Sequence, residues 1–360
     1  MNALWGGVLD TDDSRDDDTA ELRQLVDTLG RRSFDSRLGR RAVPEEFDAP
    51  LWRDLEDTGL TRLTSTADLG AGPVESAVLL YGLARHAAAI PIAETDILAA
   101  WLGSQAGIEL PDGPLTVAIG QADTATGRVS GTAPDVPWTS TCATVLVAAN
   151  GRDGLHVGIL DIESATIHEG HNLAGEPRDT ITFDVPADDL RVLDPTLTTE
   201  LQRRGAWARC VQIIGALDAA AALTVNHTRN RVQFGRSLSA FQSVQHSLAV
   251  MAGDIERARA ATTLAISAAA DHGFASPQTD YAVTVAKIVT GQVVDTATTI
   301  AHQLHGAIGV TAEHPLWLAT LRAQSWVHDY GSTALHARRL GRLVLASGDP
   351  WGLLVGEMTS

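Results

Sequence analysis

The sequence predicts an α+β protein that is mainly α, with an N-terminal helical domain, a central antiparallel β domain and a C-terminal four-helix bundle. Eleven of its 14 prolines lie at or before Pro195, and none lies between Pro195 and Pro277. Because proline breaks helices, this distribution separates a loop-rich first half from a helical second half. Short runs rich in Val, Ile and Thr follow Pro111, and apolar residues return to helical spacing from Leu197 onward.

The N-terminal part of the chain divides into a tail and a helical domain. Residues 1–18 carry six aspartates and are expected to form a solvated acidic tail. Residues 19–112 are assigned to the helical domain because apolar residues recur at helical spacing, as at Leu51 and Leu55 or at Val74, Ala77 and Leu80.

The β domain is assigned to residues 113–195. Its signals are short β-branched runs separated by Gly, Asp or Pro, at 115–119, 144–147, 155–160 and 180–185. Runs of this length with turn residues between them are typical of an antiparallel sheet or a small barrel.

The bundle is assigned to residues 196–348, with a tail at 349–360. Long helical patterns cover 198–234, 239–272, 278–306 and 314–346. Each shows one apolar stripe and the connections are short, which favours a four-helix bundle.

Composition excludes several classes of function. The 360 residues are 44% hydrophobic and 20% charged, as in an ordinary folded protein, and the net charge is -17. Such a negative charge disfavours nucleic acids and anionic membranes as partners. Two cysteines make no disulfide framework, and the acidic N-terminus does not resemble a signal peptide. We expect a cytoplasmic protein.

One corner between two helical patterns carries polar residues suited to a ligand. Gly235 is expected to end the first helix in the left-handed conformation, and Ser237 or Ser239 to cap the second. The corner then presents Arg231 together with two amides, Gln233 and Gln242, which could hold an anion or a polar cofactor.

This text resembles the acyl-CoA dehydrogenase family. The matching segments are Arg231-Val-Gln-Phe-Gly, then Ala240-Phe-Gln-Ser-Val-Gln-His and, further along the chain, Gln303-Leu-His-Gly-Ala-Ile-Gly. The order of domains matches as well. In that family FAD lies between the β domain and the bundle, and a neighbouring subunit completes the site.

The resemblance implies cofactor roles for the residues of these motifs. Arg231 would bind the FAD pyrophosphate, because its guanidinium fork suits phosphate oxygens. Gln233 and Phe234 would lie along the dinucleotide and Gln242 would hydrogen-bond it. A second corner would let the backbone approach the cofactor; it consists of Gln303, Gly306 and Ala307, where the family usually has glycine at the last position.

Structural interpretations of the same residues stay open. Arg231 could pair with a carboxylate at a helix end, Gln242 could complete a capping box with Ser239, and Gln303 could be an interface residue. His305 and His314 have no partner at metal-like spacing and are interpreted as structural. Lys287, the only lysine, is expected to pair with a carboxylate or to cap a helix end.

The β domain offers a weaker cofactor signal. Family members have a Trp-x-Thr or Trp-x-Ser segment that shields the flavin, and the corresponding text here is Trp138-Thr-Ser140. Trp138 and Ser140 are therefore candidate flavin contacts. Packing of Trp138 between the sheet and the bundle is the alternative.

The family's catalytic glutamate is missing from both of its usual places. The residue in the loop after the last motif is Tyr330, and the residue 26 positions before the motif arginine is Gly205. Three hypotheses follow. Asp329 could serve as a shifted base, a paralogous partner chain could supply the glutamate, or the chain could be a non-catalytic scaffold.

The leading hypothesis is a subunit of an FAD-dependent acyl-CoA dehydrogenase acting on an acyl-CoA thioester. It would contribute FAD contacts in an α2β2 heterotetramer whose other chain carries the base. A self-contained homotetramer that uses Asp329 is the alternative, followed by the scaffold.

Overall fold

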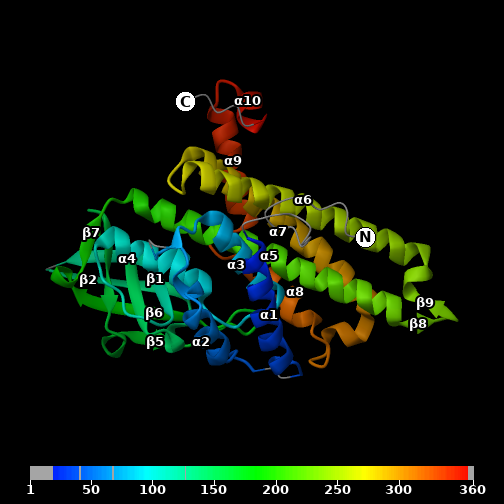
Figure 1. Ribbon diagram of the computed structural model, residues 1–360. Helices are drawn as coiled ribbons and strands as arrows, with labels where there is room; N and C mark the ends of the chain where they lie inside the picture. Colours follow the sequence, from blue (N-terminus) through cyan, green and yellow to red (C-terminus); the bar gives the residue numbers. More distant parts are fainter. Residues whose placement is uncertain (1–18, 40–41, 67–68, 126, 356–360) are drawn as a thin grey trace.

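The computed structural model describes residues 19–39, 42–66, 69–125 and 127–355 (Figure 1). A sheet lies at one end of the molecule and long helices run away from it, with a small hairpin at the far end. The predicted acidic tail, residues 1–18, falls outside the described residues.

The N-terminal helices lie in the middle of the molecule, beside the sheet and the bundle (Figure 1). They are α1 (Ala20–Arg37), α2 (Ala49–Asp57), α3 (Pro73–Arg85), the π-helical η3 (Ala93–Ala100) and its continuation α4 (Trp101–Ala106). Hydrogen bonds from backbone amides to carboxylates stabilise the first turns of two of these helices. The carboxylate of Asp48 accepts from the Leu51 amide at 3.0 Å to cap α2, and Glu75 accepts from the Gly72 amide at 2.8 Å at the start of α3.

The central domain is a mixed sheet of seven strands in the order β5-β6-β2-β1-β3-β4-β7. Its strands are β1 (Leu115–Ala125), β2 (Arg128–Pro137), β3 (Thr144–Asn150), β4 (Leu155–Leu160), β5 (Thr166–His168), β6 (Arg178–Pro186) and β7 (Arg191–Leu193). The expectation of a purely antiparallel sheet was wrong at one pair, because β1 and β3 run parallel in the register Leu115↔Thr144. Strand β2 runs antiparallel to β1, and the chain then returns so that β3 lies beside β1 and runs parallel to it. Residue patterns within single strands do not show which strands pair.

The two faces of this sheet belong to different cores. Leu115, Val117 and Leu146 pack into the main core with the helices. Neighbouring residues of the same strands, such as Ala118 and Val147, point to a second core inside the β domain. The alternation follows from the two-residue period of a strand. One face of the sheet is therefore fixed against the bundle.

The C-terminal part is built from α5 (Thr196–Asn230), α6 (Gln242–His272), α7 (Pro277–His305), α8 (Leu316–Trp326), α9 (Thr333–Ala346) and α10 (Pro350–Val355). The pattern at 314–346 was expected to be one helix, but α8 ends at Trp326 and α9 begins at Thr333. The intervening loop carries Asp329 and Tyr330. The predicted tail at 349–360 contains α10, which projects with α9 from the bundle in Figure 1.

Helix α5 is the central core helix. It is long and apolar enough to cross a membrane by length and composition, yet 67% of its apolar window is buried inside the protein. It packs against α3, α6, α7 and α8. Trp207 and Ile213 on α5 are fully buried, so the apolar surface of α5 is used in the core of the fold.

Candidate active site

The two positions where the resemblance places a catalytic base lie in contact. A Cβ built on Gly205 of α5 would lie 2.4 Å from Cε1 of Tyr330, in the loop after α8. The two alternative positions of the catalytic base that the resemblance implies, 205 and 330, are therefore neighbours in space, and here the phenol ring of Tyr330 occupies this region. Burial raises the pKa of Tyr330 above its ordinary value. The phenol stays protonated at neutral pH and supplies no base.

Hydrogen bonds to the backbone hold Tyr330 in place. Nζ of Lys287, on α7, donates to the carbonyl oxygens of Val327 at 2.9 Å and Asp329 at 2.7 Å. Nε2 of His336 donates to the Tyr330 carbonyl at 3.1 Å. Lys287 thus caps the end of α8, one of the two roles expected for it. Tyr330 itself has a φ of 56°, in the left-handed region that non-glycine residues seldom adopt.

The carboxylate of Asp329 forms ion pairs with two arginines. Its Oδ2 lies 2.8 Å from Nε of Arg209 and 3.3 Å from Nη2 of Arg178. Burial alone would raise the pKa of this carboxyl, but the charges of Arg178 and Arg209 outweigh it and hold the pKa below its usual value. A general base should have a pKa near the working pH. The structure therefore disfavours Asp329 as a shifted base.

The same arginines extend the ion pairs inward. Arg209 is 3% exposed, and its Nη2 lies 2.5 Å from Oε1 of Glu94, which is 2% exposed. Its Nη1 donates to Gln212 at 2.6 Å. Each of the three nitrogens of this buried guanidinium therefore donates at least one hydrogen bond. Arg209 therefore connects Asp329, the neighbour of Tyr330 in the chain, to the buried carboxylate of Glu94.

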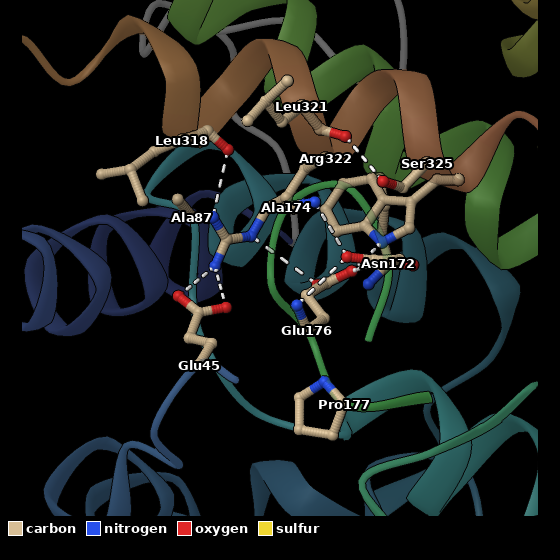
Figure 2. A network of polar contacts seen from close by, with 12 residues as sticks. Glu45, Ala87, Asn172, Ala174, Glu176, Pro177, Leu318, Leu321, Arg322 and Ser325 are labelled. Carbon is tan, nitrogen blue, oxygen red and sulfur yellow. Dashed lines mark hydrogen bonds and ion pairs between the residues drawn. The ribbon is translucent and has the colours of Figure 1, made fainter. Parts of the chain in front are cut away.

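A second group of ion pairs joins the network through Glu176 (Figure 2). Glu176 accepts from Arg178 at 3.3 Å and from the indole of Trp326 at 2.9 Å, and its Oε1 lies 3.7 Å from Nε of Arg322. Nη2 of Arg322 also donates to both carboxylate oxygens of Glu45, at 2.5 and 2.6 Å. Ion pairs and hydrogen bonds therefore connect the N-terminal domain, the β domain and the bundle around this site.

A cleft opens between the β domain and the bundle. Its volume is about 540 Å³, and Ile119 of β1, Val136 of β2, Arg178 of β6, Gln202 of α5 and Tyr330 are among its walls. A second cavity of about 310 Å³ shares Gln202 and Tyr330 and continues along α5, α7 and α9. The first cavity is within the size range of small-molecule and cofactor pockets. Tyr330 lies between the two.

The Arg231 corner lies at the C-terminal end of α5, whereas the cleft lies near the start of this helix, at Gln202. The helix ends at Asn230, and β8 (Val232–Gln233) pairs with β9 (Arg236–Ser237) in a short hairpin. Gly235 has the expected positive φ, 79°, but it turns this hairpin together with Phe234 at 52°. The expectation that Gly235 caps the helix was therefore wrong.

The side chains of this corner face outward. Arg231, Gln233 and Gln242 are exposed, and Phe234 is 92% exposed. Val232, on the same hairpin, is 58% exposed, so this corner presents two large apolar side chains to solvent. Phe241, not Ser237 or Ser239, precedes α6, and no side chain caps the helix there. The capping-box interpretation of Gln242 is wrong, which leaves its amide available.

The second corner begins with Gln303 in the last turn of α7 and continues into the residues that follow the helix. Gln303, Gly306 and Ala307 are exposed, and Gly306 has a φ of 65°. A Cβ at Gly306 would meet no atom of the described chain within 4 Å. The two corners adjoin, because the ring of His227 on α5 stacks on that of His305 at the end of α7, with centroids 4.5 Å apart. Motifs that are far apart in the sequence thus form one open surface.

Trp138 and Ser140 lie away from the cleft. Trp138 is 2% exposed and packs edge-on against Phe47 of the N-terminal domain, with ring centroids 6.4 Å apart. Ser140 is exposed and does not line the cleft. Neither residue lines this cleft, and the flavin contacts expected of them stay a prediction. The part of β2 that lines the cleft is the segment 134–137.

These features together define an α+β fold with a cleft between sheet and bundle and an open corner at the bundle's far end. The family model of the acyl-CoA dehydrogenase C-terminal domain matches residues 197–345. Acyl-CoA dehydrogenase FadE27 of Mycobacterium tuberculosis is 26% identical over 351 residues, covering 83% of this chain and 89% of the relative.

Two solved structures share the whole fold. The ChsE4-ChsE5 complex from Mycobacterium tuberculosis aligns with a TM-score of 0.82 and 24% identity, over 94% of this chain and 100% of that one. A variant of the Tcur3481-Tcur3483 steroid ACAD aligns with a TM-score of 0.77 and 27% identity, over 90% and 98%. The chain is thus similar to acyl-CoA dehydrogenases, whose cofactor is FAD, and its residues 197–345 match the C-terminal domain of that family.

The corner residues fit this cofactor. An exposed guanidinium, three exposed amides and a glycine with an open side are groups that bind a pyrophosphate and an adenosine. They lie at the C-terminal end of α5, beside the hairpin β8–β9 (Figure 1), whereas Gln202, which lines the cleft, lies near the start of that helix. This placement suits a cofactor held mainly by a second subunit.

Proposed function

We propose that this chain is the non-basic subunit of a heteromeric, cytoplasmic, FAD-dependent acyl-CoA dehydrogenase. The contact of Gly205 with Tyr330 carries the proposal, because it places both possible base positions together without a carboxylate. A paralogous partner chain supplies the catalytic glutamate, and the two chains assemble as an α2β2 heterotetramer.

In this proposal the open corner contributes to the partner's cofactor site. Arg231 binds the pyrophosphate of FAD, Gln242 and Gln303 hydrogen-bond the dinucleotide, and Phe234 covers it from solvent. Bound FAD would supply the hydride acceptor for the dehydrogenation of a CoA thioester, with a glutamate of the partner chain as the base for the α-proton. This chain therefore binds and orients the cofactor and excludes water from it, and the reaction proceeds in the partner's cleft.

Similar proteins support a two-chain assembly. Both the ChsE4-ChsE5 complex and the Tcur3481-Tcur3483 steroid ACAD are described as pairs of chains. The self-contained alternative requires Asp329 to act as base, and its two arginine partners oppose that role. A scaffold without cofactor gives no reason for the exposed Phe234 beside an exposed Arg231.

The visible spectrum of the purified protein tests the proposal. The chain is expressed alone and together with a candidate paralogous partner, and flavin absorbance per chain is measured after gel filtration. Flavin should be retained only in the complex. Stoichiometric flavin and turnover from this chain alone would contradict the proposal, and a colourless complex would favour the scaffold.

A further inference from the structure

Three histidines from distant parts of the sequence meet at the base of the open corner. They are His227 in the last turns of α5, His305 at the end of α7, and His314 in the loop before α8. One ring nitrogen from each lies within 4.8 Å of the others. Sequence spacing gave no sign of this group, because His227 belongs to a different helix, far from His305 in the chain.

His305 presents a nitrogen without a partner. Its Nδ1 lies 2.7 Å from the Ala301 carbonyl, which can only accept, so the proton is on Nδ1 and Nε2 carries a free lone pair. The side chain is 5% exposed, and among the described residues Nε2 has no hydrogen-bond partner. A buried orphan acceptor calls for a ligand, and an Nδ1–H bonded to a carbonyl is the usual outer contact of a metal-bound imidazole.

The other two rings are available for binding as well. Both are half-buried, and burial lowers the pKa of His227 and of His314, with a further contribution from His305. They are therefore neutral at physiological pH, which is the form that binds metals. The Leu316 amide donates to Nδ1 of His314 over 3.2 Å, a long bond that ligation at either nitrogen would replace.

The rings must close slightly around an ion. In a tetrahedral zinc site with bonds of about 2.0–2.1 Å, the ligand nitrogens are about 3.4 Å apart, so the separations here must shrink by about 1.4 Å at most. The planes of His227 and His305 are inclined by 25°, and rotation of the half-buried His227 would make the lone pairs converge. His305 is already held by its bond to Ala301.

We propose that His227, His305 and His314 bind one borderline divalent cation such as Zn²⁺, with solvent in the fourth position. Imidazole nitrogens are preferred ligands of such ions, and three of them with one open position are a common zinc arrangement. The ion cross-links the end of α5 to the end of α7.

Such a cross-link would fix the two cofactor corners relative to each other. The Arg231 amide donates to the His227 carbonyl at 2.9 Å, and Gly306 directly follows His305. The ion therefore lies between the residues that hold the hairpin and those that hold the glycine turn. This role is independent of which chain supplies the catalytic base.

Titration of the full chain with Co²⁺, a coloured substitute for Zn²⁺, tests the site. We expect visible absorption bands of a tetrahedral ion that saturate at one ion per chain and disappear on addition of Zn²⁺. His314→Asn and His227→Asn should each weaken binding at least about tenfold, since even an outer-shell change costs 10–100-fold in metal sites. His246→Asn, an exposed histidine on α6, is the matched control and should bind normally.

Two results would overturn the proposal. One is the absence of saturable Co²⁺ absorption in the wild-type chain. The other is equal binding by the wild type, the two variants and the control. Circular dichroism shows whether each variant is folded, and using two separate variants keeps the test valid if one of them fails to fold.

Discussion

The carboxylate of Asp329 lies 2.8 Å from Nε of Arg209, and this pair decides what Asp329 can do. Arg209 and Arg178 are almost completely buried and Asp329 is their shared partner. Removing one member of a buried network leaves an uncompensated charge, which costs about 3–5 kcal/mol. Asp329→Asn should therefore lower the free energy of unfolding by an amount of that order, measured by urea denaturation.

A surface pair provides the control for this variant. Asp184 pairs with Arg128 at 2.8 Å, and their side chains are 58% and 48% exposed. Asp184→Asn should change stability by less than about 1 kcal/mol, because solvent screens such pairs. If Asp329→Asn were as stable as Asp184→Asn and abolished turnover, Asp329 would be a catalytic base and not a structural partner.

Removal of the Tyr330 hydroxyl should be nearly silent. Tyr330→Phe keeps the ring against Gly205, and the raised pKa of the phenol leaves it no role as base. Turnover of the assembled complex should stay within about twofold of the wild type. A loss of about 10²-fold or more, the usual contribution of an acid or base, would assign the hydroxyl a direct part in the chemistry.

The Arg231 corner should control cofactor retention. Loss of a hydrogen bond to a charged group costs about 1.5–3 kcal/mol, so Arg231→Ala should weaken FAD binding in the complex by roughly 10–100-fold. Arg229→Ala, two positions earlier and also exposed, is the control and should have little effect. Flavin fluorescence released on dilution measures both. Equal retention by the two variants would place the cofactor elsewhere.

Stability should fall as the pH drops below about 6.5. Desolvation is the largest cause that lowers the pKa of six histidines, His86, His227, His302, His305, His314 and His336. Their unfolded pKa is about 6.5, so below that pH the unfolded chain binds more protons and the folded state loses stability. Above it the penalty vanishes.

Urea unfolding at pH 7.5, 6.5 and 5.5 measures this dependence. His305→Asn should reduce the slope relative to the wild type, whereas the exposed His246→Asn should leave it unchanged. A flat stability profile across this range would show that the folded imidazoles accept protons as readily as unfolded ones.

The sequence predicted the fold and singled out the two corner motifs, because both rest on local patterns, while the cofactor role of the corners stays a prediction. Helical spacing and β-branched runs follow from residues a few positions apart. Arg231 and Gln303 could be recognised from the text around them. The packing of Trp138 against Phe47 could not be predicted, because Phe47 belongs to the N-terminal domain and lies far from Trp138 in the sequence.

The ion-pair network and the histidine cluster lay beyond prediction for the same reason. Arg209 binds Glu94 and Asp329, which are 115 and 120 residues away in the chain. His227 meets His305 only because α5 and α7 end side by side. Long-range pairs of this kind depend on tertiary packing, and single-sequence periodicity carries no information about them.

Turnover of matched complexes shows which chain carries the catalytic base. The complex is prepared with the candidate catalytic glutamate of the partner changed to glutamine, and separately with Asp329→Asn in this chain. If the base lies in the partner chain, the first complex keeps its flavin and loses turnover, whereas the second retains turnover per folded complex. Loss of turnover only in the second, with flavin retained, would make this chain the catalytic subunit.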